Sequence, residues 1–312
     1  MKDTPLPCFS LIIPTLHRDE EVARLFQSIH QNTLQDLEVI LIDQNEDNRL
    51  DDTCSTYAKL FPLQRVRIRP VGVSHARNHG RQFARGRLLN FPDDDCELTP
   101  GLLQQAADRF AADPGLDLLF ARSVDPRSLK SSVTRFCTQA QAVTPRNVYS
   151  TTVEFTMFLK REIFDQVGPL DERLGVGTSY GAEEGADFVL RALYLGKKLH
   201  YDPELVFHHA QKTEGYDASA LARAYSYGRG FGRLSLKHLV HHHQPGAAVR
   251  FVHFQCRAAA GMLLHAVRRD LPRSRFYLES ILGRSAGLWN AWQDFRHQGA
   301  EAWALEGKAA SP

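Results

Sequence analysis

The chain has 312 residues, enough for one large domain or two, with 43% hydrophobic and 24% charged residues and a net charge of +2. This composition is typical of a folded globular protein and excludes one dominated by basic charge, so no nucleic-acid partner is expected. The five cysteines are scattered without a Cys-x-x-Cys pair, which favours a reduced, cytosolic setting over a disulfide scaffold or zinc site. The N-terminal apolar stretch is too short for a signal peptide, and no apolar run is long enough to cross a bilayer.

Strands alternate with helices through the first hundred residues. Continuous β-branched apolar runs predict strands, three of them buried and the third in order half-exposed. The strands expected are 8–14, 36–43, 65–71 and 87–92. One-sided apolar spacing and an acidic first turn predict a helix at 18–32, and a second helix is expected at 74–86, with Gly86 as its end. This alternation predicts a mostly parallel sheet, in which ligands lie beyond the carboxyl ends of the strands.

The second half of the chain is less regular. Residues 116–150 alternate only weakly and predict no definite element. The elements expected after them are a strand and a short helix ended by Gly168 within 151–168, a Gly-rich acidic loop at 175–187, a helix at 186–196 and a strand at 198–210. From about Thr213 onward the pattern predicts long basic helices interrupted by "HHHQPG". Its histidines, His241–His243, have no carboxylate partners in register and are expected in a solvated loop.

Three consecutive carboxylates, Asp93, Asp94 and Asp95, follow the apolar strand "RLLNF". Alternate side chains of an extended segment point the same way, so Asp93 and Asp95 can face one site. Mg²⁺ and Mn²⁺ prefer carboxylate oxygens and need few protein ligands where phosphates supply the rest. The alternative is a solvated turn that caps a helix at Thr99. The strand before the triplet, and Asp43 at the end of another strand, favour a ligand crevice.

Taken together, these segments resemble the nucleotide-sugar-dependent glycosyltransferases of family 2, which have the GT-A fold. The matching motifs are "SLIIPT", "LEVILIDQN", "ARNHG", "LLNFPDDD", "FLKREIFDQVGPLDERLG", "GAEEGADFVLRAL" and "YDPELVFHH", over roughly residues 9–210. The later "AYSYGRGFG" looks like a segment of members that build bacterial exopolysaccharides. One departure is Gln44, which follows Asp43 where the family usually has a second aspartate that helps to hold the base. The identity of the base is therefore left open.

The resemblance implies an α/β GT-A catalytic domain at 1–212, with a nucleotide-sugar half at about 1–100 and an acceptor half at about 101–212. A helical, basic C-terminal extension would follow at 213–312. The implied reaction is an inverting, metal-dependent transfer of a sugar from a UDP- or GDP-sugar to a saccharide or polyprenyl-linked acceptor, in cell-surface or exopolysaccharide synthesis. Mn²⁺ or Mg²⁺ is the implied cofactor, because charge grows on the nucleoside diphosphate as the sugar bond breaks.

The resemblance also assigns residues to the donor site. Those assigned to the nucleotide sugar are Pro14, Thr15, Asp43, Gln44, Arg77, Asp93 and Asp94. Those assigned to the metal are Asp95, Asp93 and His209, with His208 as the alternative to His209. For Arg77 the competing interpretation is a solvated basic helix face shared with Arg81 and Arg85.

An inverting transfer also requires a carboxylate that takes the proton from the acceptor hydroxyl. In "GAEEGAD", Glu184 is the nearest counterpart of the family's base, and Glu183 is the neighbouring rival. Asp187 fits a capping or positioning role better. The alternative is that these acids only favour the dipole at the start of a helix.

Two other functions compete with this interpretation. A sugar-nucleotide pyrophosphorylase would need a Gly-rich, basic phosphate loop after the first strand, where this chain has the acidic "PTLHRDEE". A catalytically inactive GT-A module that only binds a nucleotide sugar would be expected to have lost its carboxylates, and here they are intact.

The segment from Val249 to Trp292 carries seven arginines against Asp270 and Glu279. Amphipathic helices with arginines on the polar side can lie in the headgroup region of an anionic membrane. We therefore expect a cytoplasmic protein that docks peripherally on the inner face of the cytoplasmic membrane. Packing of these helices on the catalytic domain, or a dimer seam, is the alternative.

Overall fold

The computed structural model of the chain describes residues 6–211 and 215–303. Its contacts divide the chain into two compact units, the first made of Met1–Leu170 and Phe188–Lys212. The second unit is made of Asp171–Asp187 and Thr213–Pro312. The segment Asp171–Asp187 therefore groups with the C-terminal helices. A domain boundary at residue 212 remains a prediction.

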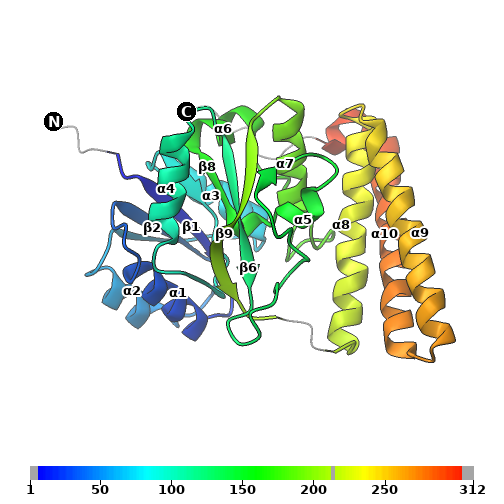
Figure 1. Cartoon of the computed structure of the whole chain (residues 1–312), viewed down its shortest axis with the longest axis horizontal. Coiled ribbons are helices and arrows are strands. Elements are labelled where there is room, and N and C mark those ends of the chain that lie inside the picture. The colour runs from blue at the N-terminus through cyan, green and yellow to red at the C-terminus, as the bar shows by residue number, and fades with distance from the viewer. Residues whose placement is uncertain (1–5, 212–214, 304–312) are drawn as a thin grey trace. The chain divides into compact units, whose positions relative to one another are not determined.

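Unit 1 is built on one sheet, nine-stranded within the described residues, in the order β3-β2-β1-β4-β8-β6-β9-β5, with β7 paired to β9 (Figure 1). The strands are β1 (Phe9–Thr15), β2 (Leu37–Asp43), β3 (Leu63–Arg67), β4 (Leu88–Asn90), β5 (Cys96–Leu98), β6 (Leu118–Val124), β7 (Gln141–Ala142), β8 (Met157–Lys160) and β9 (Leu199–His209). From β3 to β4 the neighbours are parallel, as predicted. β8 is antiparallel to β4 and to β6, so the second half of the sheet is mixed.

Helices pack on both faces of this sheet, which confirms the predicted α/β class. The helices of this part of the chain are α1 (Glu20–His30), α2 (Asp51–Tyr57), α3 (Val73–Arg81), α4 (Leu102–Ala112), α5 (Val148–Thr151), the 3-10 turn η1 (Glu154–Thr156), α6 (Arg161–Val167) and α7 (Glu184–Tyr194). Strand β1 shows the two-sided core, because Leu11 and Ile13 join the core that contains Phe26 of α1. Between them, Ile12 joins the opposite core, which contains Phe164 of α6. Each fully buried side chain of this size contributes about 1.5–3 kcal/mol, so both faces of β1 stabilise the fold.

The helix expected at 74–86 ends earlier than predicted, at Arg81. Gly86 is not its end. A Cβ at Gly86 would collide with the backbone of Phe9 and Ser10, so this glycine lets the chain pass close to β1. Its N–H donates to the hydroxyl of Ser10 at 2.8 Å. By contrast, Gly168 (φ 87°) and Gly196 (φ 71°) end helices in left-handed conformations, as predicted.

Within its described residues, unit 2 contains three long helices, α8 (Ala218–Val240), α9 (Pro245–Val267) and α10 (Leu271–Gln298), and the 3-10 turn η2 (Gly299–Trp303). They confirm the predicted helical character of the C-terminal region. The backbones of α8 and α10 approach closely at glycines. A Cβ at Gly228 would lie 2.9 Å from backbone atoms of α10, and one at Gly283 would lie 2.2 Å from the carbonyl oxygen of Tyr225. None of the helices in the described ranges combines the length and the apolar character that a bilayer span requires.

Candidate active site

The acidic triplet lies in the short connection between β4 and β5, at one end of the unit 1 sheet. Strand β5 pairs antiparallel with β9, and this register sets Cys96 opposite His209. The pairing brings His209 to the triplet. The ligand atoms of Asp93, Asp95 and His209 all lie within 4.8 Å of one another, and His209 Nε2 is 3.3 Å from Asp95 Oδ1. The structure thus brings together the three residues predicted to bind metal.

His209, and not His208, is the histidine of this group. Successive side chains of β9 point to opposite faces of the sheet, so the two histidines cannot share one site. The His209 side chain is only 4% exposed, and its ring stacks on Phe155 at a centroid distance of 5.2 Å. Two carboxylates and one imidazole form a donor set that suits Mn²⁺ or another divalent ion of that class.

Two arginines contact the carboxylates of this group. Arg77 is 1% exposed, and its guanidinium donates to Asp93 Oδ1 at 2.7 Å. Arg18 donates to Asp95 Oδ2 at 3.0 Å. The alternative of a solvated basic face is wrong for Arg77, because the side chain is buried against the triplet. Arg81, by comparison, pairs with Asp165 at 2.6 Å.

Arg18 is a residue that the sequence pattern did not indicate. It follows β1 by three positions in "PTLHRDEE", a stretch that reads as acidic. The available signal was its place just beyond the carboxyl end of a buried strand, where ligand contacts of α/β sheets gather.

Asp94 differs from its neighbours in its protonation. Burial raises the pKa of the Asp94 carboxyl from 3.8 to about 7; the charges of Asp95 and Asp93 act in the same direction, while Thr15 and Arg18 lower this pKa. At neutral pH this carboxyl is therefore poised between its two protonation states, and a nearby cation would favour the charged one.

A second polar group lies at the ends of β1 and β2. The strand register sets Pro14 opposite Ile42, and Thr15 opposite Asp43. Asp43 is fully buried and accepts two hydrogen bonds from Arg65, at 2.9 and 2.7 Å. The side-chain oxygen of Gln44 accepts from the Gly72 N–H at 2.7 Å. Thr15, Asp43 and Gln44 thus form one buried polar rim, as the strand-end prediction requires.

Glu183 and Glu184 belong to unit 2. Glu184 is the first residue of α7 and is 3% exposed. Glu183 precedes it with a φ of 82°, a left-handed conformation that is rare for a residue other than glycine. The Glu183 carbonyl accepts a hydrogen bond from the N–H of Asp187 at 2.9 Å. Backbone strain of this kind gathers at functional sites.

Comparison with known proteins gives matches in sequence and in fold. The model of the family described as glycosyl transferase family 2 matches residues 10–168. A Campylobacter jejuni protein, the GalNAc(5)-diNAcBac-PP-undecaprenol beta-1,3-glucosyltransferase, is 33% identical over 119 residues, which are 34% of this chain and 37% of that protein. The matched segments span 61% or less of the length of each of the curated relatives found.

Two solved structures show the same fold over nearly the whole chain. S. aureus TarS 1–349, in complex with UDP-GlcNAc, has a TM-score of 0.62 at 17% identity and covers 93% of this chain and 92% of that one. The mannosyltransferase PcManGT from Pyrobaculum calidifontis, in complex with GDP-Man and Mn²⁺, has a TM-score of 0.61 at 17% identity, covering 92% and 88%. At this identity the likeness shows the fold alone, and it confirms the expected GT-A architecture.

Proposed function

The chain belongs to glycosyl transferase family 2, and from that premise we propose that it transfers a sugar from a UDP- or GDP-sugar to a saccharide or polyprenyl-linked acceptor. The observation that carries the proposal is the grouping of Asp93, Asp95 and His209 at one end of the sheet. Solved structures of the same fold hold UDP-GlcNAc in one case and GDP-Man with Mn²⁺ in another. They support a nucleotide-sugar donor and a divalent cation.

On the donor side, Asp95, Asp93 and His209 would hold Mn²⁺ or Mg²⁺. The cation, when bound, neutralises charge on the nucleoside diphosphate as the bond to the sugar breaks. Arg18 and Arg77 hold one oxygen of Asp95 and of Asp93 respectively, which orients these carboxylates. Their own positive charges add to the stabilisation of the leaving diphosphate.

The nucleotide is assigned to the neighbouring strand ends. Pro14, Thr15, Asp43 and Gln44 would contact the base, while Arg77, Asp93 and Asp94 would contact the ribose and the first phosphate. Gln44 offers an amide, both donor and acceptor, where relatives have a carboxylate that only accepts. Nucleotide sugars with different bases should therefore be compared to identify the donor.

The transfer step is assigned to the acids at the start of α7. Glu184 takes the proton from the acceptor hydroxyl as its oxygen attacks the anomeric carbon, and the bond to the diphosphate breaks on the opposite side. The sugar inverts its configuration, and the diphosphate leaves with the bonding electrons. Glu183 is the rival for the same role.

The nature of the acceptor indicates the biosynthetic role of the protein. A relative whose name specifies an undecaprenol-linked acceptor supports a lipid-linked acceptor here, and so a role in cell-surface polysaccharide synthesis. The C-terminal helices support a peripheral contact with an anionic membrane. Exposed apolar residues on α9 lie among arginines, with Val249 70% exposed and Val252 58% exposed.

The test is release of nucleoside diphosphate by the full chain from a panel of UDP- and GDP-sugars with Mn²⁺. A transferase turns over at least one donor, slowly with water and faster with a saccharide acceptor. A catalytically inactive binding module is the alternative, and it would be stabilised by a donor with Mn²⁺ while releasing nothing. That second result would overturn the proposed function.

A further inference from the structure

The segment Tyr180–Asp187, called the acidic segment from here on, contains both candidate bases and lies along one face of α8. Its contacts with α8 include those at Ser226, Gly230, Arg233 and Lys237. These positions are separated by about one helical turn each, so they share one side of the helix. The acidic segment and α8 both belong to unit 2, and the arrangement is internal to that unit.

Backbone meets backbone where the acidic segment passes Gly230. A Cβ at this position would lie 2.5 Å from the carbonyl oxygen of Ala182 and 3.1 Å from that of Tyr180. It could fit only if the acidic segment moved away. Gly181 makes a similar approach from the other side, since its Cβ would collide with the hydroxyl of Ser226. Gly230 therefore sets how closely the acidic segment lies on α8.

Tyr180 fixes the first end of the acidic segment. The guanidinium groups of Arg233 and Arg229 lie 5.0 and 5.5 Å from the centroid of its ring. The Tyr180 hydroxyl donates to Asp294 Oδ2 of α10 at 3.0 Å. Aromatic packing and a hydrogen bond thus hold this end to two helices.

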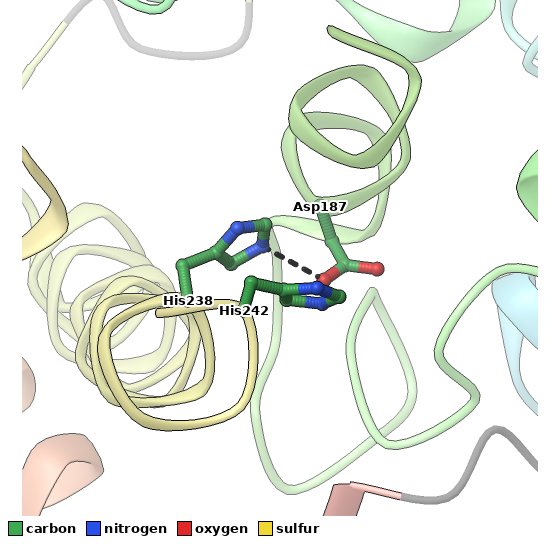
Figure 2. A group of neighbouring side chains, drawn as sticks. All are labelled: Asp187, His238 and His242. Atoms are coloured by element: carbon green, nitrogen blue, oxygen red, sulfur yellow. Dashed lines mark hydrogen bonds and ion pairs between the residues drawn. The ribbon is translucent and has the colours of Figure 1, made fainter. Parts of the chain in front are cut away.

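Asp187 fixes the second end. Lys237 Nζ lies 2.8 Å, and His238 Nε2 3.0 Å, from the same oxygen, Asp187 Oδ1. Figure 2 shows the Asp187 carboxylate facing the imidazole of His238. Lys237 also binds Asp171 Oδ2 at 2.9 Å, and all four side chains are buried. A buried carboxylate that lost such partners would be strongly destabilising, so these contacts fix the position of Asp187.

His242 lies at the same place and raises the question of a metal. The ligand atoms of Asp187, His238 and His242 lie within 4.8 Å of one another. The prediction of a solvated loop holds for the exposed His241 and His243 and is wrong for the half-buried His242. However, the ammonium of Lys237 already binds Asp187 Oδ1 and would repel a cation there. The charges therefore favour an ion-pair network internal to unit 2 over a metal site. This network of Asp171, Asp187, Lys237 and His238 is called the lock from here on.

The lock explains the unusual backbone conformation of Glu183. Its φ of 82° is unfavourable for a residue with a side chain. Strained conformations persist where the surroundings over-determine them. Here the chain is held on one side at Tyr180 and Ala182, and on the other at Asp187. The strain falls between these anchors, next to Glu184.

We propose that α8 is a positioning platform for the catalytic acids, with Gly230, Lys237 and His238 as positioning residues. This rests on the proposed function, in which Glu184 or its rival Glu183 accepts the proton. The platform gives "AYSYGRGFG" a role, because Gly230 serves the acidic segment while Gly228 faces α10. Displacing a general base by about 1 Å lowers the reaction rate on the order of 10²-fold.

The first test compares two glycines of α8. Gly230→Ala is expected to lower kcat for the UDP- or GDP-sugar that the wild type turns over fastest, by about 10- to 100-fold. Its Kd for UDP with Mn²⁺ stays that of the wild type. Gly228→Ala is the matched control, because the three atoms nearest to its Cβ all belong to α10, at distances of 2.9 to 3.1 Å. It is expected to lower the thermal midpoint but to keep kcat. Equal kcat losses in both variants would assign Gly230 a merely structural role and overturn the proposal.

The second test uses His238, because Lys237→Met would leave Asp171 and Asp187 buried without their shared ammonium. His238→Phe keeps the volume but loses the contact with Asp187, and His238→Gln restores a donor. We expect faster amide exchange at 181–187 and a lower kcat in His238→Phe, both partly rescued in His238→Gln. Ser235→Ala, which also lies at a buried position of α8, is the control. Unchanged exchange and kcat in His238→Phe would overturn the platform.

Other outcomes separate this proposal from the function on which it rests. If Glu184→Gln and Glu183→Gln are both fully active, the proposed mechanism fails, and faster exchange in His238→Phe then reports only a structural lock. If Glu184→Gln or Glu183→Gln is inactive while Gly230→Ala and His238→Phe keep wild-type kcat, the function stands and the platform is wrong. Stoichiometric Zn²⁺ binding by Asp95→Ala that is lost in Asp95→Ala/His242→Ala would show a metal site at Asp187 and overturn the lock.

Discussion

His209 lies 3.3 Å from Asp95, measured from Nε2 to Oδ1, because β5 and β9 pair antiparallel with Cys96 opposite His209. The two residues come from distant parts of the chain, and a strand of only three residues brings them together. Arg18 donates a hydrogen bond to the other oxygen of this carboxylate, Asp95 Oδ2. A divalent cation placed here would therefore meet a carboxylate and an imidazole in fixed orientations.

Asp95→Ala is expected to abolish Mn²⁺-dependent binding of UDP and GDP while leaving the fold intact. The variant removes the carboxylate that both His209 and Arg18 contact, from a side chain that is 11% exposed, and only the few atoms of that carboxylate are lost. Asp93→Ala should weaken binding less. Calorimetric titration of nucleotide with and without Mn²⁺ measures both, and circular dichroism checks the fold. An unchanged Mn²⁺-dependent affinity in Asp95→Ala would remove Asp95 from the metal site.

His209→Ala should lower the affinity for Mn²⁺ with UDP by about tenfold or more, because losing a ligand costs at least as much as losing a group that orients one. His208→Ala is the matched control. The two histidines are neighbours on β9 with side chains on opposite faces, so a general effect on the strand would appear in both variants. Equal affinities in the two variants would contradict the assignment of His209.

Glu184→Gln is expected to keep nucleotide binding and to lower the transfer rate by about 10²-fold or more, the usual contribution of a general base. The amide keeps the shape of the buried side chain and cannot accept the proton. Glu183→Gln is measured beside it under the same conditions. If Glu183→Gln is the variant with the lower transfer rate, Glu183 is the base. If neither variant has a lower rate, the inverting mechanism is wrong.

The sequence predicted those parts of the site that lie at the ends of regular strands. Asp43 and Asp93 were recognisable because continuous apolar runs, buried on both faces, precede them. Strand β6 was missed because Arg122 interrupts its apolar run, which leaves neither a long continuous run nor a regular alternation. Asp187 was expected to cap or position, but its partners Lys237 and His238 were not predicted. Long-range ion pairs leave no periodic signal in a sequence.

The protonation of Asp94 should make nucleotide binding depend on pH. Its folded-state pKa of about 7 lies above the ordinary value of 3.8, so its contribution to stability is complete below that ordinary value and is lost as the pH rises through 7. Cation and ribose both favour the charged form. We therefore expect the affinity for UDP with Mn²⁺ to rise between pH 5 and 7, by up to tenfold per pH unit. In Asp94→Asn, the affinity should change with pH only as far as the nucleotide and the other ligands titrate. If the affinity of Asp94→Asn changes with pH as steeply as that of the wild type, Asp94 is not the titrating group.

The last prediction concerns the surface of the C-terminal helices. In α9 the residues fully buried among those described are alanines, whereas Val252 and Val267 are 58% and 83% exposed. Arginines at 250, 257, 268 and 269 accompany these apolar side chains. An apolar helix surface edged by arginines suits the headgroup region of an anionic membrane, to which each basic residue adds about 1 kcal/mol.

The full chain should therefore sediment with vesicles that contain phosphatidylglycerol at low salt, and release at high salt, because the charge attraction is screened within roughly 10 Å at 0.1 M. Val249→Asp/Val252→Asp is expected to stay in the supernatant, since it places charges where apolar side chains would enter the headgroups. Leu129→Asp is the control, because Leu129 is 74% exposed but lies in unit 1. Sedimentation of neither wild type nor control would exclude membrane docking and leave the packing of these helices, on the catalytic domain or on a second copy, as their role.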